Sequence, residues 1–559
     1  MKRADFPVKS FTIAGIDISE YRIVYGKGDE YAASELCDFI KSACGIRLVK
    51  MQSKGAFSHE IRVGRVNETD KVKAEVDTLG DDGYAVIYDD AALYISGKTH
   101  SGVLYGVYTF IEDKLGFRFL SSKITAHNGV SDVGIPADIN ETYTPPFINR
   151  DTYWYDSFEL KFAARRKLDG TGGRADSPYI SSVLYAGGFV HTLPRLAGTS
   201  TAPDAQPCLT DPAVYEKVIG NVRDLLRKNP KAKIISVSQN DSYPGGLGCQ
   251  CENCRKIDDA EGTPMGSLLT FVNRVANDIK DEFPDVYVDT LAYRYTRKAP
   301  KHIKPADNVI IRLCSIECCF AHPLESECPA NKEFASDIEA WSKISKNLFI
   351  WDYTTDFLYY VNPFPNLKVL RDNEEFFARH NVIGMFEQGN GQSYSAEFGE
   401  LRAYLISKLL WDPYMSEAEY YKNMDEFLRL YYGDGWRYIR EYIDKTSEKA
   451  KELHLGIYDR ADKTLHAVNN DGQIELGFAT EMSELWDKAL EAADAEHYDR
   501  VERSAQQIRS ALLYLKRGMR ESTEQAKILY GTLKKHGITY FREGVPMPAD
   551  EDGSRALID

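Results

Sequence analysis

The chain has 559 residues, enough for three or four domains of about 150 residues each. Hydrophobic residues make up 43% of it and charged residues 27%, a globular composition that excludes a disordered or fibrous protein. The net charge is −15, so nucleic acids and anionic membranes, whose binding depends on positive charge, are not expected as partners. The 35 tyrosines stand out, because a ring with a hydroxyl group suits sugar binding, although core packing explains such residues as well.

The N-terminus and the apolar runs bear on where the protein acts. No apolar stretch approaches the roughly 18 residues that a membrane-spanning helix needs. The first residues, MKRADFPVKSFTIAGIDI, contain only a short apolar run that Asp17 interrupts, so they do not resemble a secretory signal. The sequence as written is therefore expected in the cytoplasm, or in the periplasm or outside the cell if a leader has been trimmed. The sequence does not indicate an oligomeric state.

Residues 1–140 alternate strand-like and helix-like segments and predict an N-terminal α/β domain. Short β-rich runs bounded by turn residues are expected as strands, and longer amphipathic runs as helices. Turn-forming residues over 134–146 predict a linker to the next domain. The strands are expected at 11–18, 21–26, 60–64, 83–90 and 91–97, and the helices at 31–45 and 101–116.

Residues 147–415 alternate apolar strands with amphipathic helices, which predicts a parallel sheet closed as a (β/α)8 TIM barrel. An open doubly wound sheet is the competing fold, and the lack of a glycine-rich phosphate loop after any predicted strand disfavours it. The strands are expected at 147–154, near 180–189, and at 233–239, 286–293, 308–315, 348–353 and 382–387. The helices are expected at 211–229, 266–283, 331–345, 366–380 and 397–411.

Residues 416–559 show helical periodicity without strand signals and predict a C-terminal helical domain. Its helices are expected at 417–433, 436–453, 474–493 and 498–519. The predicted fold class is therefore α/β, with a central barrel between an N-terminal α/β domain and a C-terminal α-helical domain.

Polar residues recur where the predicted barrel strands end, which is where a barrel binds its substrate. Four of them are acids that would repel one another unless a site uses them, although a strand-end Asp or Asn also serves as a turn or cap residue. His191 is interpreted either as lining this site or as a hydrogen-bonded structural histidine. The candidate catalytic acids are Asp241, Glu317, Asp352 and Glu387. The candidate substrate-binding residues are Arg150, His191, Asn240, Tyr293, Trp351, Tyr353 and Asn390.

Acids interleaved with tyrosines, with no nucleotide motif and no Ser/His/Asp arrangement, favour glycoside hydrolysis. That reaction needs a proton donor for the leaving oxygen and a nucleophile or negative charge near the oxocarbenium-like carbon. Asn240 beside Asp241 also suits the substrate-assisted variant, in which the sugar's 2-acetamido oxygen attacks while a side chain orients its N–H group. We expect Asp241 to orient the acetamide or assist proton transfer, and Glu317, kept protonated by neighbouring carboxylates, to be the general acid. Asp352 and Glu387 would hold sugar hydroxyls or tune the other acids.

The cysteines gather in two clusters, one at 249–254 and one at 314–328. Cys249, Cys251 and Cys254 have the spacing of metal ligands, so a structural zinc is one interpretation, with thiolates or His322 of the second cluster completing it. A disulfide and free thiols are the alternatives. A redox CxxC motif is disfavoured, because no helix N-terminus is evident there to lower a thiol pKa. The expected reaction needs no cofactor.

Four long motifs carry a resemblance to a known family: SVSQNDSYPGGLGCQCENC, CSIECCFAHPLESECPAN, IWDYTTDF and FEQGNGQSYSAEFGELRAYLISKLLWDP. They resemble a bacterial family long classed as a domain of unknown function and linked to glycoside hydrolase family 163. The resemblance runs from about residue 20 to about 430, and its N-terminal part is similar to the α/β domain that precedes the barrel in α-glucuronidases and β-hexosaminidases.

This resemblance implies a (β/α)8 barrel and a retaining endo-β-N-acetylglucosaminidase that degrades N-glycans by substrate assistance. The chain has Asn240-Asp241 where many substrate-assisted hexosaminidases carry an Asp-Glu pair. One alternative is an exo-acting enzyme on glucuronides or another small glycoside, with Arg150 as the partner of the uronate. The other alternative is a carbohydrate-binding protein without catalysis.

Overall fold

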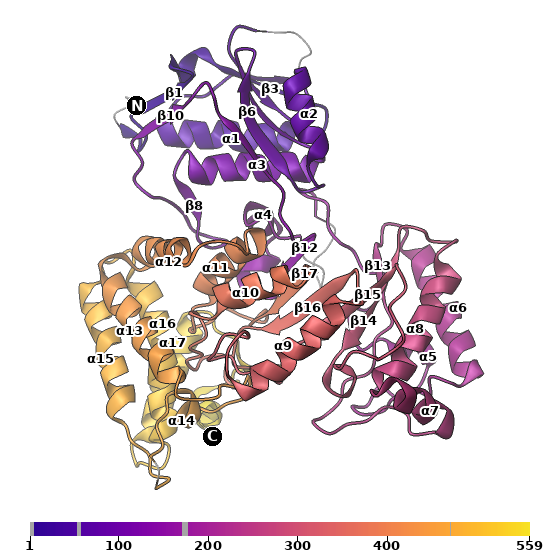
Figure 1. Ribbon diagram of the computed structural model, residues 1–559. Coiled ribbons are helices and arrows are strands. Elements are labelled where there is room, and N and C mark those ends of the chain that lie inside the picture. Colours follow the sequence, from indigo (N-terminus) through magenta and orange to yellow (C-terminus); the bar gives the residue numbers. More distant parts are fainter. Residues whose placement is uncertain (1–4, 53–56, 170–176, 470, 559) are drawn as a thin grey trace. The chain divides into compact units, whose positions relative to one another are not determined.

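A computed structural model describes residues 5–52, 57–169, 177–469 and 471–558, which fold into two compact units (Figure 1). The first unit is made of the residues before 149 together with 159–169 and 177–182. The second unit is made of 149–158 and the residues from 183 onward, so the curled sheet and the C-terminal helices belong to one unit.

The first unit is built on a six-stranded mixed sheet with the order β11-β6-β7-β5-β3-β4. The expected strands and both expected helices are present. The segment predicted as a linker instead contains β11, which pairs with β6, so that prediction is wrong. The sheet strands are β3 (Arg22–Tyr25), β4 (Lys50–Gln52), β5 (Glu60–Val63), β6 (Tyr84–Asp89), β7 (Ala92–Gly97) and β11 (Asn140–Tyr143). The other elements are β1 (Ser10–Ile13), β2 (Ile16–Asp17), β8 (Phe117–Phe119), β9 (Thr125–His127), β10 (Asp132–Ile135), α1 (Glu30–Cys44), α2 (Asp70–Thr78), α3 (His100–Asp113) and α4 (Leu160–Arg165).

The second unit contains a curled sheet of six parallel strands with the order β12-β17-β16-β15-β14-β13. The first strand pairs with the last, as in a barrel, and Tyr185 adds a single parallel bridge to Ile234 beyond β13. The residues near 180–189 thus give a bridge in place of the expected strand. Among the described residues no eighth strand closes the ring, so the structure shows a curled parallel half-barrel. The strands are β12 (Asn149–Thr152), β13 (Ile234–Ser236), β14 (Tyr287–Ala292), β15 (Val309–Cys314), β16 (Leu348–Tyr353) and β17 (Val382–Gln388).

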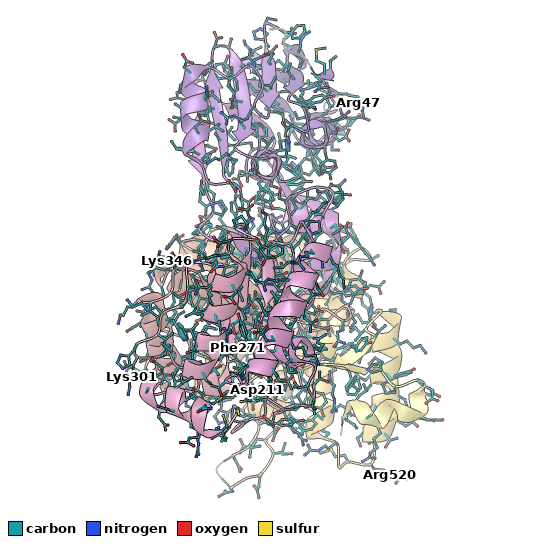
Figure 2. The ribbon with its side chains drawn as sticks, turned by 90° about the vertical axis from the view of Figure 1, so that its right-hand side faces the viewer. Arg47, Asp211, Phe271, Lys301, Lys346 and Arg520 are labelled. Carbon is teal, nitrogen blue, oxygen red and sulfur yellow. The ribbon has the colours of Figure 1, made fainter. Side chains whose placement is uncertain are left out.

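The helices between these strands lie on the outer face of the sheet, where α8 packs on β14, α10 on β17 and α11 on β12. Their sequences explain their limits and packing. Asp211 caps α6 by accepting a hydrogen bond from the N–H of Ala213 at 2.8 Å, and Phe271 of α8, labelled with Asp211 in Figure 2, meets the ring of Tyr215 edge to face. The helices are α5 (Leu193–Ala197), α6 (Pro212–Lys228), α7 (Glu252–Glu261), α8 (Met265–Ile279), α9 (Pro329–Ser342), α10 (Leu370–Arg379) and α11 (Gly399–Trp411).

The C-terminal region is helical as predicted and packs around the buried ring of Trp486, which Tyr442 and Phe398 contact. It also contains a short hairpin, β18 (Tyr540–Arg542) with β19 (Val545–Pro546), so the prediction that strands are absent after residue 416 is wrong. No helix of the described residues is long and apolar enough to cross a membrane. The helices are α12 (Glu417–Tyr432), α13 (Trp436–Ala450), α14 (Ala461–Thr464), α15 (Gly477–Ala492), α16 (Tyr498–Leu515) and α17 (Ser522–Lys535).

The alternation of side chains along the curled sheet decides which residues reach its inner face. On β16, Phe349 packs with Ile234 and Ile310 inside the curl, so Trp351 and Tyr353 point inward as well. The intervening Asp352 points outward, toward the helices. The same parity holds on β17, where Glu387 is paired with Asp352.

Candidate active site

Apolar side chains fill the bottom of the inner face of the curl. A buried ion pair lies above them, two residues further along the strands. Arg312 of β15 lies 3.0 Å from Asp289 of β14, and both side chains are almost fully buried. Ser236 donates a further hydrogen bond to Asp289 at 3.2 Å. The charges neutralise each other and satisfy much of their hydrogen-bonding capacity, so the pair is a structural layer beneath the open end of the curl.

The open end, which we call the mouth, is formed by side chains at and beyond the C-terminal ends of the strands. Asp241 lies there after β13, with a side chain that is 54% exposed. Its Oδ1 accepts hydrogen bonds from the N–H of Ser242 at 2.8 Å and from the hydroxyl of Tyr293 at 3.1 Å. Arg294 donates to the Tyr293 hydroxyl oxygen at 2.8 Å, which polarises the phenol toward the carboxylate. Among the described residues no donor contacts Oδ2 of Asp241, so this oxygen can accept a hydrogen bond from a ligand.

A second carboxyl group reaches the mouth from the C-terminal hairpin. Glu543 occupies the turn between β18 and β19, its backbone N–H donates to the carbonyl of Phe357 at 3.1 Å, and Gln388 donates to its Oε1 at 3.3 Å. Partial desolvation raises the pKa of Glu543; the Gln388 hydrogen bond opposes this, and the charge of Asp241 adds to it. Glu543 is not among the residues predicted from the sequence, where its only signal is an acid followed by glycine between two short β-rich runs.

Aromatic side chains are connected to these two acids by hydrogen bonds, ring contacts and charge. Trp351 donates from Nε1 to Oε1 of Gln388 at 2.8 Å, which orients the amide so that its Nε2 faces Glu543. The rings of Trp351 and Tyr353 are stacked, with centroids 6.1 Å apart. Tyr458 adds a half-exposed ring, and its pKa is raised to about 12 by burial and by the charges of both mouth carboxyl groups. The predicted binding residues Tyr293, Trp351 and Tyr353 thus share one site.

His191, interpreted from the sequence either as lining the site or as a structural histidine, lies beside Asp241. Its Nδ1 lies 3.0 Å from the carbonyl of Gln239, and its Nε2 lies 4.0 Å from Oδ1 of Asp241. Burial lowers the pKa of His191, although the Gln239 carbonyl opposes this, so the imidazole is neutral with its proton on Nδ1. The unprotonated Nε2 is therefore an acceptor on the Asp241 side of the ring.

Glu317 follows β15 and is partly exposed, with an ion pair to Arg297 at 2.7 Å. Arg297 also pairs with Glu333 and Asp337. The charged group that contacts Glu317 is therefore a cation, and not one of the carboxylates expected beside it from the sequence.

Asp352 and Glu387 lie on the outer face of the sheet, where they meet Glu374 of α10 in a fully buried carboxyl cluster. Burial raises the pKa of Asp352 to about 6, against a hydrogen bond from Ser315, and raises the pKa of Glu374 to about 8. Burial and the charge of Glu374 raise the pKa of Glu387 well above its usual value. The cluster holds protons at neutral pH, but its side chains point away from the mouth.

Three further residues that were predicted to bind substrate instead contact other parts of the protein. Arg150 of β12 points outward, with its guanidinium 5.5 Å from the ring centre of Trp411. Asn240 donates to the carbonyl of Ala202 at 2.7 Å, which ties down the preceding loop. Asn390 accepts from the N–H of Gln392 at 3.0 Å and so shapes the loop after β17. The sequence correctly placed all three after or within strands, but their side chains do not line the mouth.

The three cysteines predicted as zinc ligands are joined by Cys208, so that four thiols lie within 4.8 Å of one another. Cys208 Sγ is 3.7 Å from Cys251 Sγ and 4.0 Å from Cys254 Sγ. Cys251 caps α7, so the expectation that no helix N-terminus lies here is wrong. Hydrogen bonds, above all from the N–H of Cys254, lower the pKa of Cys251 to about 6.

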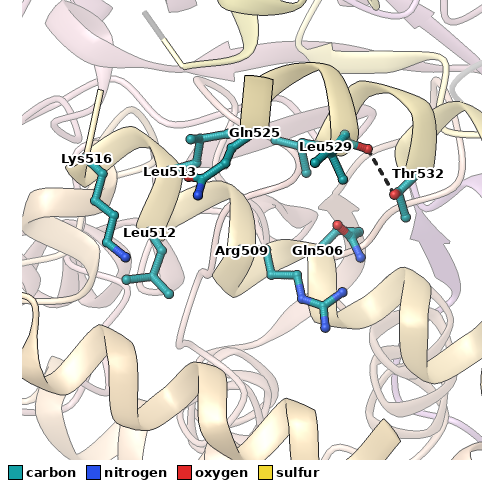
Figure 3. A pocket seen from close by; sticks show the side chains of 9 residues that line it. Gln506, Arg509, Leu512, Leu513, Lys516, Gln525, Leu529 and Thr532 are labelled. Atoms are coloured by element: carbon teal, nitrogen blue, oxygen red, sulfur yellow. Dashed lines mark hydrogen bonds between the residues drawn. The ribbon is translucent and has the colours of Figure 1, made fainter. Parts of the chain in front are cut away.

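A separate cavity of about 250 Å³ lies between α16 and α17 (Figure 3). No carboxyl group is among the described residues that line it, so it offers neither of the acidic groups that glycoside cleavage requires. Its lining consists of Gln506, Arg509, Leu512, Leu513, Lys516, Gln525, Ile528, Leu529 and Thr532.

Comparison with known proteins identifies the family. Residues 119–444 match the family described as a domain of unknown function (DUF4838), which is more than half of the chain. The chain belongs to this family. Residues 22–110 match the family described as the N-terminus of glycosyl hydrolase family 67, which confirms the expected glycoside hydrolase-like character of the N-terminal α/β domain. No curated protein matches the sequence.

Two solved structures share the fold of this DUF4838 protein at 10% sequence identity. One is a GH138 enzyme targeting pectin rhamnogalacturonan II, with a TM-score of 0.52 over 96% of this chain and 78% of that chain. The other is a family GH115 4-O-methyl-α-glucuronidase with specificity for decorated arabinogalactans, with a TM-score of 0.54 over 94% of this chain and 76% of that chain. The fold is therefore one that glycoside hydrolases use, while the link to family 163 stays a prediction.

Proposed function

We propose that this DUF4838 protein is a retaining glycosidase that cleaves β-linked N-acetylglucosamine within N-glycan-type oligosaccharides. The observation that carries the proposal is the presence of two carboxyl groups at the mouth: Asp241, held by Tyr293, and Glu543, whose pKa is raised in part by the charge of Asp241. The shared fold and the match to a glycosyl hydrolase N-terminus support a carbohydrate substrate.

The Asp241–Tyr293 pair complements the acetamide group of such a sugar. An acetamide presents an N–H donor, and the pair offers a carboxylate acceptor whose Oδ1 is held by the Tyr293 hydroxyl. Oδ2 of Asp241 can accept the acetamide N–H, which orients the carbonyl oxygen toward the anomeric carbon. The partly exposed ring of Trp351, which stacks on the buried ring of Tyr353, supplies an apolar surface for the sugar face or the acetamide methyl group.

The proposed reaction then proceeds in two balanced steps. In the first, Glu543 donates its proton to the glycosidic oxygen, the bond from that oxygen to the anomeric carbon breaks, and the acetamide oxygen forms a new bond to this carbon. In the second, the Glu543 carboxylate takes a proton from water, whose oxygen attacks the same carbon and releases the acetamide. Two inversions give net retention, and the two steps use side chains, substrate and one water molecule.

Glu317 as the general acid is the competing assignment, and the two acids make opposite predictions. Glu543 is favoured because partial burial and the charge of Asp241 raise its pKa, whereas Glu317 forms an ion pair with Arg297. A Glu317→Gln variant that keeps turnover within about tenfold of wild type rules out Glu317, because general acid catalysis contributes 10² to 10⁴.

A glucuronidase acting from the chain end is the second candidate function. The predicted uronate partner, Arg150, faces the helices, but Arg294 brings a cation to the mouth. One of the two proteins that share the fold is a 4-O-methyl-α-glucuronidase, which agrees with this candidate.

A single screen separates the two candidates. The protein is incubated with an aryl β-N-acetylglucosaminide, aryl glucuronides and a complex N-glycan, and the product masses are read. Cleavage inside the N-glycan supports the first candidate, and release of glucuronic acid alone supports the second. Glycan binding without any hydrolysis would contradict both and favour a carbohydrate-binding protein.

We also propose that Cys208, Cys249, Cys251 and Cys254 hold a structural zinc ion. Four thiolates around a tetrahedral zinc lie about 3.8 Å apart, given Zn–S bonds of about 2.3 Å. The distances of 3.7 and 4.0 Å from Cys208 fit this geometry. A Cys208→Ser variant is expected to lose one zinc ion per chain, and unchanged zinc content would contradict the proposal.

A further inference from the structure

A second group of metal-ligand side chains lies outside the mouth and outside the four-thiol cluster. It consists of Cys319, His322, Cys328 and His454, whose ligand atoms all lie within 4.8 Å of one another. Cys319 Sγ is 3.2 Å from His322 Nδ1, and Cys328 Sγ is 3.3 Å from His454 Nδ1. Three of these residues come from the loop between β15 and α9, and the fourth comes from the segment between α13 and α14, more than 120 residues later.

The surroundings hold the cluster in place. Asn331, fully buried in the first turn of α9, accepts from the N–H of Cys319 at 2.7 Å and donates to the carbonyls of Cys319 and His322 at 3.0 Å. The N–H of Leu455 lies 3.4 Å from Cys319 Sγ, where it stabilises a thiolate. His322 Nε2 lies 3.0 Å from the carbonyl of Lys451, so Nε2 carries the proton and Nδ1 presents its lone pair to the cluster. A histidine fixed through its other nitrogen in this way is characteristic of metal sites.

We propose that these four side chains bind a second structural zinc ion, as a Cys₂His₂ site. Zinc takes two thiolates and two imidazoles in a tetrahedron with bonds of about 2.3 and 2.1 Å, so ligand atoms lie about 3.4 to 3.8 Å apart. The 3.2 and 3.3 Å contacts need to lengthen by only a few tenths of an ångström. With four protein ligands the coordination is closed, which makes the ion structural and not catalytic.

The proposed ion crosslinks the loop after β15 to the segment that carries Tyr458 into the mouth. The two segments are already joined there by a hydrogen bond from Phe320 N–H to the Leu455 carbonyl at 2.8 Å, and Phe357 N–H donates to Ile457 at the same distance. The residue that follows Ile457 is Tyr458. The zinc site therefore fixes one wall of the mouth, and this consequence alone rests on the proposed function.

The test measures zinc in the full-length protein by elemental analysis after purification without chelator. Cys328→Ser and His454→Ala are each expected to contain one zinc ion fewer per chain than wild type, and to melt at a lower temperature. The controls are Cys37→Ser, which removes a buried cysteine elsewhere, and His302→Ala, which removes an exposed histidine; both should keep the wild-type zinc content. His454→Cys retains a ligand and is expected to restore the lost ion.

Wild-type protein provides a readout that does not depend on folding of the variants. Alkylation followed by mass spectrometry should find Cys319 and Cys328 protected until a chelator is added, and then modified. Equal zinc in wild type, Cys328→Ser and His454→Ala would overturn the proposal. So would alkylation of both thiols at the same rate with and without chelator, or a disulfide between them in protein prepared with reductant.

Discussion

Replacing Glu543 by glutamine tests the assignment of the general acid, because the amide keeps the shape and the Gln388 contact but cannot donate a proton to a leaving group. Loss of a general acid costs 10² to 10⁴ in rate, or about 3 to 5 kcal/mol of transition-state stabilisation. The loss should appear in kcat for an N-glycan or for an aryl glycoside with a poor leaving group. It should shrink toward wild-type rates for a dinitrophenyl glycoside, whose leaving oxygen needs no proton.

The pH profile gives the same assignment an independent check. Desolvation and the Asp241 charge raise the pKa of Glu543, so the carboxyl group stays protonated and active to higher pH than a solvated one. Activity should fall as pH rises through this pKa, and the alkaline limb should be absent in Glu543→Gln. Glu317→Gln is the matched control, expected within about tenfold of wild type with an unchanged profile. A full loss in Glu317→Gln with a mild effect of Glu543→Gln would refute the reasoning.

Three further predictions follow from the described contacts. Tyr293→Phe removes the hydroxyl group that holds Asp241, and steady-state kinetics should show about a tenfold loss of kcat/KM for an N-acetylglucosaminide. Unchanged kinetics would show that this hydrogen bond does not contribute to catalysis. Asp289→Asn leaves Arg312 buried without its counter-charge, and urea unfolding should show a loss of about 3 to 5 kcal/mol; a loss below about 1 kcal/mol would contradict the buried pair. The pKa of Glu374 is raised to about 8, so the folded protein retains a proton that the unfolded chain releases near pH 4.5. The free energy of unfolding should therefore fall as pH rises from about 5 to 8. Glu374→Gln should flatten this slope, and an unchanged slope would contradict the raised pKa.

The strands of the curled sheet could be predicted because most are short apolar runs with turn residues at their ends. β12 (Asn149–Thr152) is the exception, since its four residues are polar and only the residues that flank it are apolar. The same runs located Asp241 and Tyr293, since the residues after a parallel strand gather at one edge of the sheet. Which acid reaches the mouth could not be predicted, because neighbouring residues of a strand point to opposite faces. Trp351 and Tyr353 therefore point inward while Asp352 between them joins the buried carboxyl cluster.

The residues that sequence reasoning missed come from distant segments. Glu543 lies in a two-strand hairpin that is too short to show an alternation of apolar and polar residues. Only its tertiary hydrogen bonds to Phe357 and Gln388 place it at the mouth. Cys208 and His454 likewise complete their clusters across 41 or more residues of chain, so local spacing gave three of four thiols at one cluster and only part of the other. The spacing of a sequence motif reveals metal ligands that lie in one loop, but it does not reveal ligands that only the fold brings close to that loop.

The most direct test of the central claim, substrate assistance at the Asp241–Tyr293 pair, is a rate series with aryl β-N-acetylglucosaminides whose acetamide methyl carries zero, one, two or three fluorines. Fluorine withdraws electrons from the acetamide oxygen and weakens it as a nucleophile, while the leaving group stays the same. If the acetamide oxygen is the nucleophile, kcat/KM should fall steeply with each fluorine added. A rate independent of fluorination, or no hydrolysis of the parent compound, would contradict it.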